Sequence, residues 1–176
     1  MGAPILPARS QALLEALAER VVIADGAMGT MLQEHAPTLE DYQQLEGCNE
    51  ILNVSRPDII RAIHGAYLDT GIDCVETNTF GANWSNLSDY GIEHRITELA
   101  REGAALAREV CDDYESRDGR VRWVLGSMGP GTKLPSLGHT TYAHLKATFA
   151  EQAVGLIEGG ADAFLIETSQ DLLQTK

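Results

Sequence analysis

The sequence predicts an α/β fold in which about four parallel strands alternate with helices. Four short apolar runs, each bounded by turn residues, have the length of buried strands: residues 21–24, 74–80, 121–125 and 163–166. The segments between these runs place apolar residues three or four positions apart, which is typical of amphipathic helices. Strands that alternate with helices in this way lie parallel and are joined by right-handed crossovers.

Four helices are predicted from this periodicity and from their end signals. They cover about residues 10–20, the segment from Pro57 to Gly71, residues 96–110, and the segment from a cap at Thr140 or Thr141 to Gly159. Proline suits the first turn of a helix and glycine suits the position after its end, so both support these boundaries.

A weak internal repeat relates two of the predicted strands. Gly71 is followed five residues later by Glu76, and Gly160 is followed seven residues later by Glu167. Because the two offsets differ by two, both glutamates should point to the same face of their strands. Such a repeat is typical of a βα-barrel or a doubly wound sheet. A closed barrel has eight strands, so we expect the first half of a (βα)8 TIM-type barrel, truncated.

The charge of the chain limits which partners it can bind, and its cysteine content indicates the compartment in which it works. The chain has 176 residues with 13 basic and 26 acidic side chains, a formal charge of −13, which predicts neither a nucleic acid nor a membrane as partner. The sequence shows neither a bilayer-spanning apolar run nor a secretion signal. Three widely spaced cysteines, Cys48, Cys74 and Cys111, suit a reducing compartment. We therefore expect a cytoplasmic protein.

Three acidic residues follow predicted strands at the point where each strand ends. These are Asp25, Glu76 and Glu167. Because parallel α/β folds hold their active sites at the C-terminal strand ends, the three carboxylates should share one rim. Such a cluster attracts a cation, either a divalent metal or a substrate ammonium group. The alternative is a structural role, in which they cap helices or accept hydrogen bonds from rim amides.

The loops at the same rim contain glycines and a serine. Gly26 and Gly29 let backbone N–H groups approach a ligand closely. Ser127 could donate a hydrogen bond to a ligand, although a plain turn also explains it. Cys48 is the cysteine expected in a loop, but it has no CxxC partner, so no metal ligand is predicted in this chain.

Five segments in a fixed order resemble a known family. They are Asp25–Thr30, Gly47–Glu50, Glu76–Gly81, Gly126–Pro130 and Glu167–Thr168. Together they resemble the homocysteine-binding domain of cobalamin-dependent methionine synthases, which are homocysteine S-methyltransferases. The resemblance implies that residues 10–176 form the N-terminal part of a homocysteine-binding βα-barrel domain. Residues 1–9 are expected to be a disordered N-terminal segment.

The resemblance also implies a substrate and a set of binding residues. Asp25 and Glu167 would hold the ammonium group of L-homocysteine, and the amides from Gly26 to Gly29 would hold its carboxylate. The expected substrate-binding residues are Asp25, Gly26, Ala27, Gly29, Glu76, Asn78, Ser127 and Glu167. In the family, three cysteine thiolates bind zinc, which activates the homocysteine sulfur to take a methyl group from methylcobalamin.

The family's zinc cysteines follow its sixth and eighth strands, so this chain is expected to hold neither metal ligands nor catalytic residues. The expected partners are the missing C-terminal half of the barrel and the cobalamin and folate domains, and the isolated chain should be inactive. Two alternatives stay open. One is a stand-alone, non-catalytic α/β module that binds a small molecule. The other is a divalent-metal-dependent lyase or hydrolase with Asp25, Glu76 and Glu167 as ligands.

Overall fold

The computed structural model describes residues 6–170 and 172–176. Its helices are α1 (Ala8–Glu19), α2 (Met28–His35), α3 (Leu52–Ser55), α4 (Pro57–Leu68), α5 (Trp84–Leu87), α6 (Ile96–Asp118), α7 (Tyr142–Glu158) and α8 (Leu172–Thr175). Its strands are β1 (Cys74–Glu76), β2 (Trp123–Met128) and β3 (Ala163–Ile166). Short 3-10 turns occupy Asn49–Ile51, Ser88–Tyr90, Glu93–Arg95 and Pro135–Leu137.

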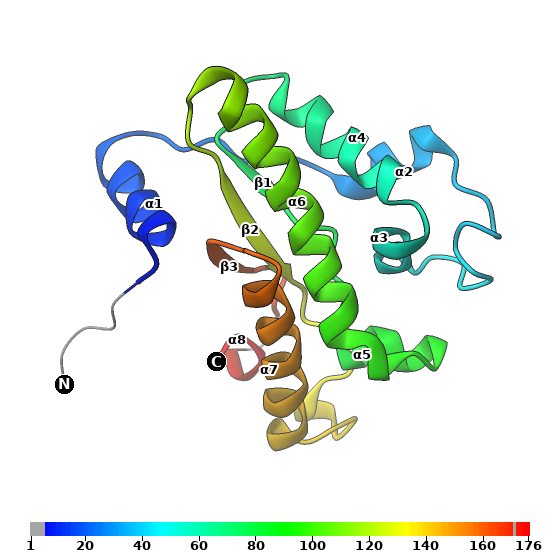
Figure 1. Ribbon diagram of the computed structural model, residues 1–176. Helices are drawn as coiled ribbons and strands as arrows, with labels where there is room; N and C mark the ends of the chain where they lie inside the picture. The colour runs from blue at the N-terminus through cyan, green and yellow to red at the C-terminus, as the bar shows by residue number, and fades with distance from the viewer. Residues whose placement is uncertain (1–5, 171) are drawn as a thin grey trace.

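The strands form an open parallel sheet in the order β1-β2-β3. The register pairs Glu76 with Leu125 and Ser127 with Leu165, so the C-terminal ends of the strands meet at one edge. Helices α6 and α7 lie side by side against the sheet, and α4 flanks α6 on its other side (Figure 1). The α/β class and the alternation of parallel strands with helices are therefore confirmed.

The first predicted strand is shorter than expected. Of residues 21–24, only Ala24 forms a parallel bridge, with Cys74. The carbonyl of Ile23 accepts the Asp73 and Cys74 N–H groups at 2.8 and 3.0 Å. Val21, however, is 81% exposed, because no element of the described chain covers it. The sheet thus has three strands where about four were predicted.

Strand β2 also departs from its predicted bounds, since it runs from Trp123 to Met128 rather than over 121–125. The added part includes Gly126 and also Ser127, which was expected in a loop. A Cβ at Gly126 would lie 2.9 Å from Leu156 Cδ1. The glycine therefore lets α7 pack closely on the strand.

The predicted helices are present, with shifted ends. Thr141 caps α7, since its side chain accepts the His144 N–H. Helix α1 begins at Ala8, so residues 8 and 9 are helical although they were expected in a disordered segment; residues 1–5 lie outside the described residues.

The core is built around α6. Its apolar face, predicted from the spacing, is buried in the structure: Ile96, Leu99, Gly103, Leu106 and Val110. Part of this face packs against α3 and α4, and part packs against β1 and β2. In the described part of the chain, no helix has both the length and the apolar character that crossing a bilayer requires.

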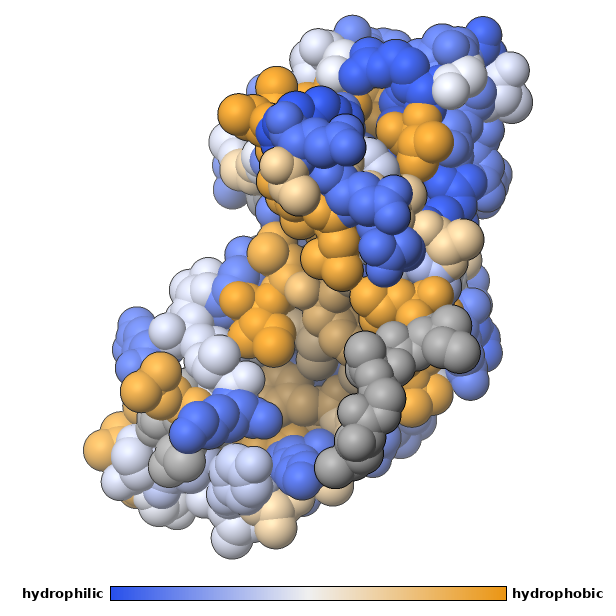
Figure 2. Space-filling model, turned by 90° about the vertical axis from the view of Figure 1, so that its left-hand side faces the viewer, coloured by the Kyte–Doolittle hydropathy of each residue, from blue (hydrophilic) through white to orange (hydrophobic). Residues whose placement is uncertain are grey.

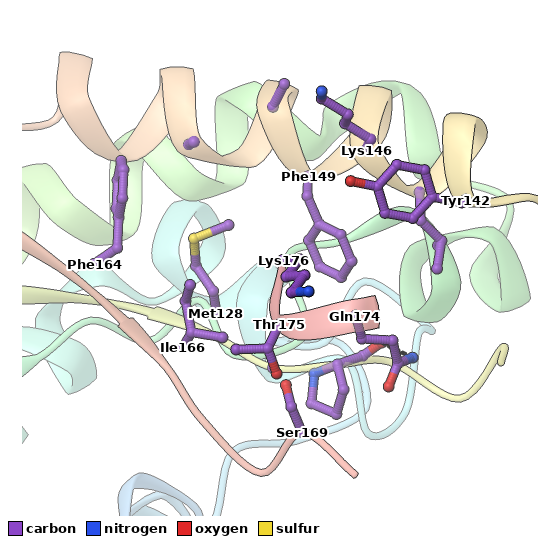
Figure 3. A pocket seen from close by; sticks show the side chains of 15 residues that line it. Met128, Tyr142, Lys146, Phe149, Phe164, Ile166, Ser169, Gln174, Thr175 and Lys176 are labelled. Atoms are coloured by element: carbon purple, nitrogen blue, oxygen red, sulfur yellow. Dashed lines mark hydrogen bonds between the residues drawn. The ribbon is translucent and has the colours of Figure 1, made fainter. Parts of the chain in front are cut away.

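The face beyond β3 is apolar and open. Phe164 and Ile166 on β3 are 45% and 50% exposed, and Ile157 on α7 is 63% exposed. Figure 2 shows apolar side chains gathered around a hollow on this side of the molecule. A pocket of about 230 Å³ lies between α7 and the C-terminal residues, with Met128, Phe149 and Ile166 in its lining (Figure 3). This pocket lacks the acidic residues predicted to carry function.

Candidate functional site

A cavity of about 420 Å³ lies at the C-terminal ends of the strands. Its lining includes all eight residues predicted for the binding site: Asp25, Gly26, Ala27, Gly29, Glu76, Asn78, Ser127 and Glu167. They come from the end of the first extended segment, the ends of β1 and β2, and the residue after β3. The structure therefore brings together residues that are up to 142 positions apart in the sequence.

Asp25 lies at the base of this cavity. Its carboxylate oxygens accept the Glu76 N–H at 2.9 and 3.1 Å, which ties the first extended segment to the end of β1. Burial raises the pKa of Asp25 from 3.8 to about 7, although the hydrogen bond from Glu76 acts in the opposite direction. A bound cation would favour the charged carboxylate, so Asp25 is suited to hold one.

Glu76 and Glu167 add negative charge to the same wall. Burial and the nearby charge of Glu167 raise the pKa of Glu76. Ser127, at the end of β2, donates a hydrogen bond from Oγ to Glu167 Oε1 and so orients that carboxylate. None of the described residues that line the cavity is basic. The negative charge of this wall therefore has no internal counter-ion in the lining.

The N-terminus of α2 also borders this cavity. Gly26, Ala27, Met28 and Gly29 border the cavity, and α2 begins at Met28 with Ala27 in the cap position. No side chain among the described residues caps this terminus. The first N–H groups of a helix have no acceptor within the helix and carry partial positive charge, so they favour an anionic group. The hydroxyl of Tyr67 donates to the Ala27 carbonyl at 3.1 Å and holds the loop in place.

Asn78 borders the cavity, but its amide group is used within the protein. Its Nδ2 donates to the Asn49 carbonyl at 2.8 Å and to Asn53 Oδ1 at 2.9 Å. Asn53 Nδ2 in turn donates to the Asn78 carbonyl at 2.9 Å. These bonds fasten the segment after β1 to α3 and to the 3-10 turn before it, and they fix the shape of the wall.

Sequence reasoning missed five lining residues: Met28, Asn49, Glu50, Thr77 and Phe80. Thr77 joins the strand ends, because its Oγ1 accepts the Ser127 N–H at 3.0 Å. Asn49 and Glu50 follow no strand, so strand-end reasoning could not find them. The signal that could have found them is the Gly47–Glu50 segment, which was used only as part of the resemblance.

The cysteines do not fit a zinc site. Each is buried, and they belong to different core clusters: Cys48 beside Ile51, Cys74 beside Trp123, and Cys111 beside Val124. Burial raises the pKa of each thiol to about 12, whereas zinc binds the thiolate. Cys48, expected to be accessible in a loop, is only 1% exposed.

The described carboxylates are not arranged to bind a metal ion either. Within residues 6–170 and 172–176, no group of three or more His, Cys, Asp or Glu side chains is arranged to hold a metal ion. The hypothesis of a divalent-metal-dependent lyase or hydrolase therefore gains no support from the positions of Asp25, Glu76 and Glu167.

Comparison with known proteins adds to this geometry. Residues 22–176 match the family described as Homocysteine S-methyltransferase. The chain belongs to the homocysteine S-methyltransferase family. It is 58% identical over 164 residues to a methionine synthase of Mycobacterium tuberculosis and 56% identical to one of Mycobacterium leprae. The matched part is 93% of this chain but only 14% of each methionine synthase, so the chain spans a small part of the length of these relatives.

Solved structures of this family share the fold. The homocysteine methyltransferase MmuM from Escherichia coli, in its oxidized form, matches with a TM-score of 0.73 at 21% identity. The match covers 96% of this chain and 59% of MmuM. The metallated form of MmuM gives the same TM-score at 22% identity. The open three-stranded sheet thus corresponds to part of the larger MmuM fold.

Proposed function

We propose that the chain forms the amino-acid-binding part of a homocysteine S-methyltransferase of the cobalamin-dependent methionine synthase type, and that it binds L-homocysteine in the acidic cavity. The observation that supports this proposal is that the cavity is lined both by negatively charged carboxylates and by a helix N-terminus with partial positive charge. Carboxylates without a basic neighbour in the lining and an uncapped helix N-terminus border the same cavity. An amino-acid zwitterion, with one ammonium and one carboxylate group, is complementary to both walls.

Each wall then has a defined part in binding. Asp25 and Glu167 accept hydrogen bonds from the ammonium group, with Ser127 orienting Glu167. The amides from Gly26 to Gly29 hold the carboxylate at the start of α2. Glu76 adds negative charge beside Glu167. The chain therefore holds and orients the substrate, and the side chain of homocysteine carries the sulfur away from both charged walls.

Methyl transfer needs groups that these residues do not supply. The three cysteines do not fit zinc, so the zinc and methylcobalamin that the resemblance implies would be held by other parts of the enzyme. The proposed partners are the rest of the barrel and the cobalamin and folate domains. Three free cysteines are consistent with the reducing cytoplasm, where we place the protein.

Calorimetric titration with L-homocysteine tests the proposal directly. We expect saturable binding, and we expect weaker binding of 4-mercaptobutyrate, which lacks the ammonium group, and of 3-mercaptopropylamine, which lacks the carboxylate. Equal affinity for all three ligands, or no binding of L-homocysteine, would show that the cavity does not recognise an amino-acid zwitterion.

A turnover assay tests the separation of binding from catalysis. The 176-residue chain, supplied with zinc, L-homocysteine and methylcobalamin, should form no methionine, because none of its buried thiols fits zinc. Methionine formation at a rate above the protein-free control would contradict the assignment of the chain as the binding part alone.

A further inference from the structure

Glu50 is a buried carboxylate at the edge of the acidic cavity. The residue is only 8% exposed, and no basic side chain in the described ranges forms an ion pair with it. Its Oε1 accepts the Gly81 N–H at 2.7 Å, and its Oε2 lies 3.8 Å from Cys48 Sγ, which donates to it. Burying a carboxylate without a basic partner costs free energy of folding, so we expect Glu50 to have a specific role in the structure.

The contact between Glu50 and Gly81 depends on the missing side chain of Gly81. A Cβ at this position would lie 2.7 Å from Glu50 Oε1, closer than real Cβ atoms approach. Gly81 belongs to the loop that follows β1, and this loop also carries Asn78 and Phe80. Glu50 therefore anchors this loop to the segment that precedes α3.

Phe80, the neighbour of Gly81, connects this loop to the one after β2. Its carbonyl accepts the Gly129 N–H at 3.0 Å. Its ring lies against Gly129, where a Cβ would be 2.6 Å from Phe80 Cε2. The position of Phe80 is thus fixed on one side by Gly129 and on the other, through Gly81, by Glu50.

Phe80 also lies between two cavities. It lines the acidic cavity and a neighbouring cavity of about 440 Å³. The second cavity is lined by uncharged residues: Asn86, Pro130, Gly131, Thr132, Leu134, Thr168, Gln170 and Gln174. Phe80 is therefore placed to limit how far a ligand in the acidic cavity extends toward the uncharged one.

We propose that Glu50 is a positioning residue that, through Gly81, holds Phe80 as the partition between the two cavities and so sets the length of amino-acid side chain that the site accepts. This proposal rests on the proposed binding of homocysteine. Glu50 acts as a hydrogen-bond acceptor for Gly81 and makes no contact with the substrate ammonium group.

The ratio of affinities for L-homocysteine and its S-ethyl derivative, L-ethionine, tests the proposal. One or two extra methylene groups change affinity about 10-fold or more where a wall is fixed, so Phe80→Ala should shift the ratio toward L-ethionine by about that factor. Glu50→Ala should produce the same shift. Glu50→Gln keeps an acceptor for Gly81 and should stay within about twofold of the unmodified chain. The double variant Glu50→Ala/Phe80→Ala should shift no further than Phe80→Ala alone.

Two further variants keep the result interpretable. Thr148→Ala truncates a buried polar residue on α7 outside the lining of both cavities, and it should leave the ratio unchanged. If Glu50→Ala does not fold, Gly81→Ala disturbs the same contact from the other side and should shift the ratio. An unchanged ratio in the folded variants would overturn the proposal, and so would an equal loss of homocysteine binding in Glu50→Gln and Glu50→Ala.

Amide hydrogen exchange gives a second readout that needs no ligand. Glu50→Ala should accelerate exchange at Gly81 and also at Gly129, which Glu50 does not touch, whereas Glu50→Gln should not. Acceleration at Gly81 alone would mean that Glu50 has only a local structural role, and the proposal would fail. Because this measurement is independent of homocysteine, it separates a failure of the positioning role from a failure of the proposed function.

Discussion

The carboxylates at the two ends of the parallel sheet have different partners. At the C-terminal end, Asp25, Glu76 and Glu167 line a cavity without a basic residue in its described lining. At the N-terminal end, Asp73 receives two hydrogen bonds from Arg20 at 2.8 and 2.9 Å, and Asp162 accepts one from Arg108 at 3.0 Å. The two sets of acids come from the same sheet but differ in their partners.

The pKa values follow the partners. The hydrogen bonds from the Arg20 guanidinium lower the pKa of Asp73, whereas burial raises that of Asp25 to about 7. Asp162 departs from this pattern, because its burial raises its pKa although Arg108 acts in the opposite direction. Asp73, whose pKa its arginine partner lowers, stabilises the fold in its charged form, whereas Asp25 carries a cost that a bound cation would offset. The comparison therefore separates acids of the scaffold from acids of the site.

The largest effect expected from this comparison is on ligand binding. Asp25→Asn should weaken L-homocysteine binding between about 100- and 1,000-fold, because it removes one of the two carboxylates proposed to hold the ammonium group. At neutral pH the free energy of unfolding should not fall, because asparagine removes a buried carboxylate that costs stability there and its carbonyl can still accept the Glu76 N–H. Calorimetric titration and urea unfolding measure the two quantities. Unchanged affinity in a folded Asp25→Asn variant would remove Asp25 from the site.

The pH dependence of stability sharpens the comparison further. The pKa of Asp25 rises from 3.8 to about 7 on folding, so the folded chain binds more protons in this window and the free energy of unfolding falls as pH rises. His64 acts in the opposite direction. It is fully buried without a hydrogen-bond partner among the described residues, and burial lowers its pKa from 6.5 to about 4. Its contribution is therefore lost as pH falls from about 6.5 to 4.

The contributions of Asp25 and His64 to the free energy of unfolding change with pH in opposite directions, each by about 1 kcal/mol per pH unit. They should therefore nearly cancel between pH 4 and 6.5. His64→Leu removes one of them, so its free energy of unfolding should fall by about 2 kcal/mol across the window as pH rises. Asp25→Asn removes the other, so its free energy of unfolding should rise with pH relative to that of the unmodified chain. Urea unfolding at several pH values measures both. Slopes of the same sign in the two variants would contradict the assignment of either group.

Much of the site could be predicted from the sequence because strand ends are a strong constraint. Asp25, Glu76 and Glu167 each follow an extended run, and parallel strands carry such residues to one edge. The even difference between the offsets of Glu76 and Glu167 placed them on the same face, and they line the same cavity. Periodicity likewise identified the buried face of α6, because a 23-residue helix repeats its pattern over many turns.

The features that could not be predicted from the sequence depend on contacts between distant segments. Glu50 accepts a hydrogen bond from Gly81, which is 31 residues away in the sequence, and no local sequence pattern predicts that contact. The first strand was overestimated because Val21 and Ile23 have an apolar strand pattern, yet they are 81% and 54% exposed where no described element covers them. Whether such residues form a strand is decided by neighbouring strands and not by propensity.

The smallest expected effect is on the scaffold side of the comparison. Asp73→Asn should lower the free energy of unfolding by about 1 kcal/mol, because the carboxylate is buried but its Arg20 partner is half exposed and well solvated. L-Homocysteine affinity should stay within about twofold, since Asp73 lies at the opposite end of β1 from the cavity. A loss of affinity as large as that of Asp25→Asn, in a variant that is still folded, would mean that the two ends of the sheet are coupled. The division between scaffold acids and site acids would then be wrong.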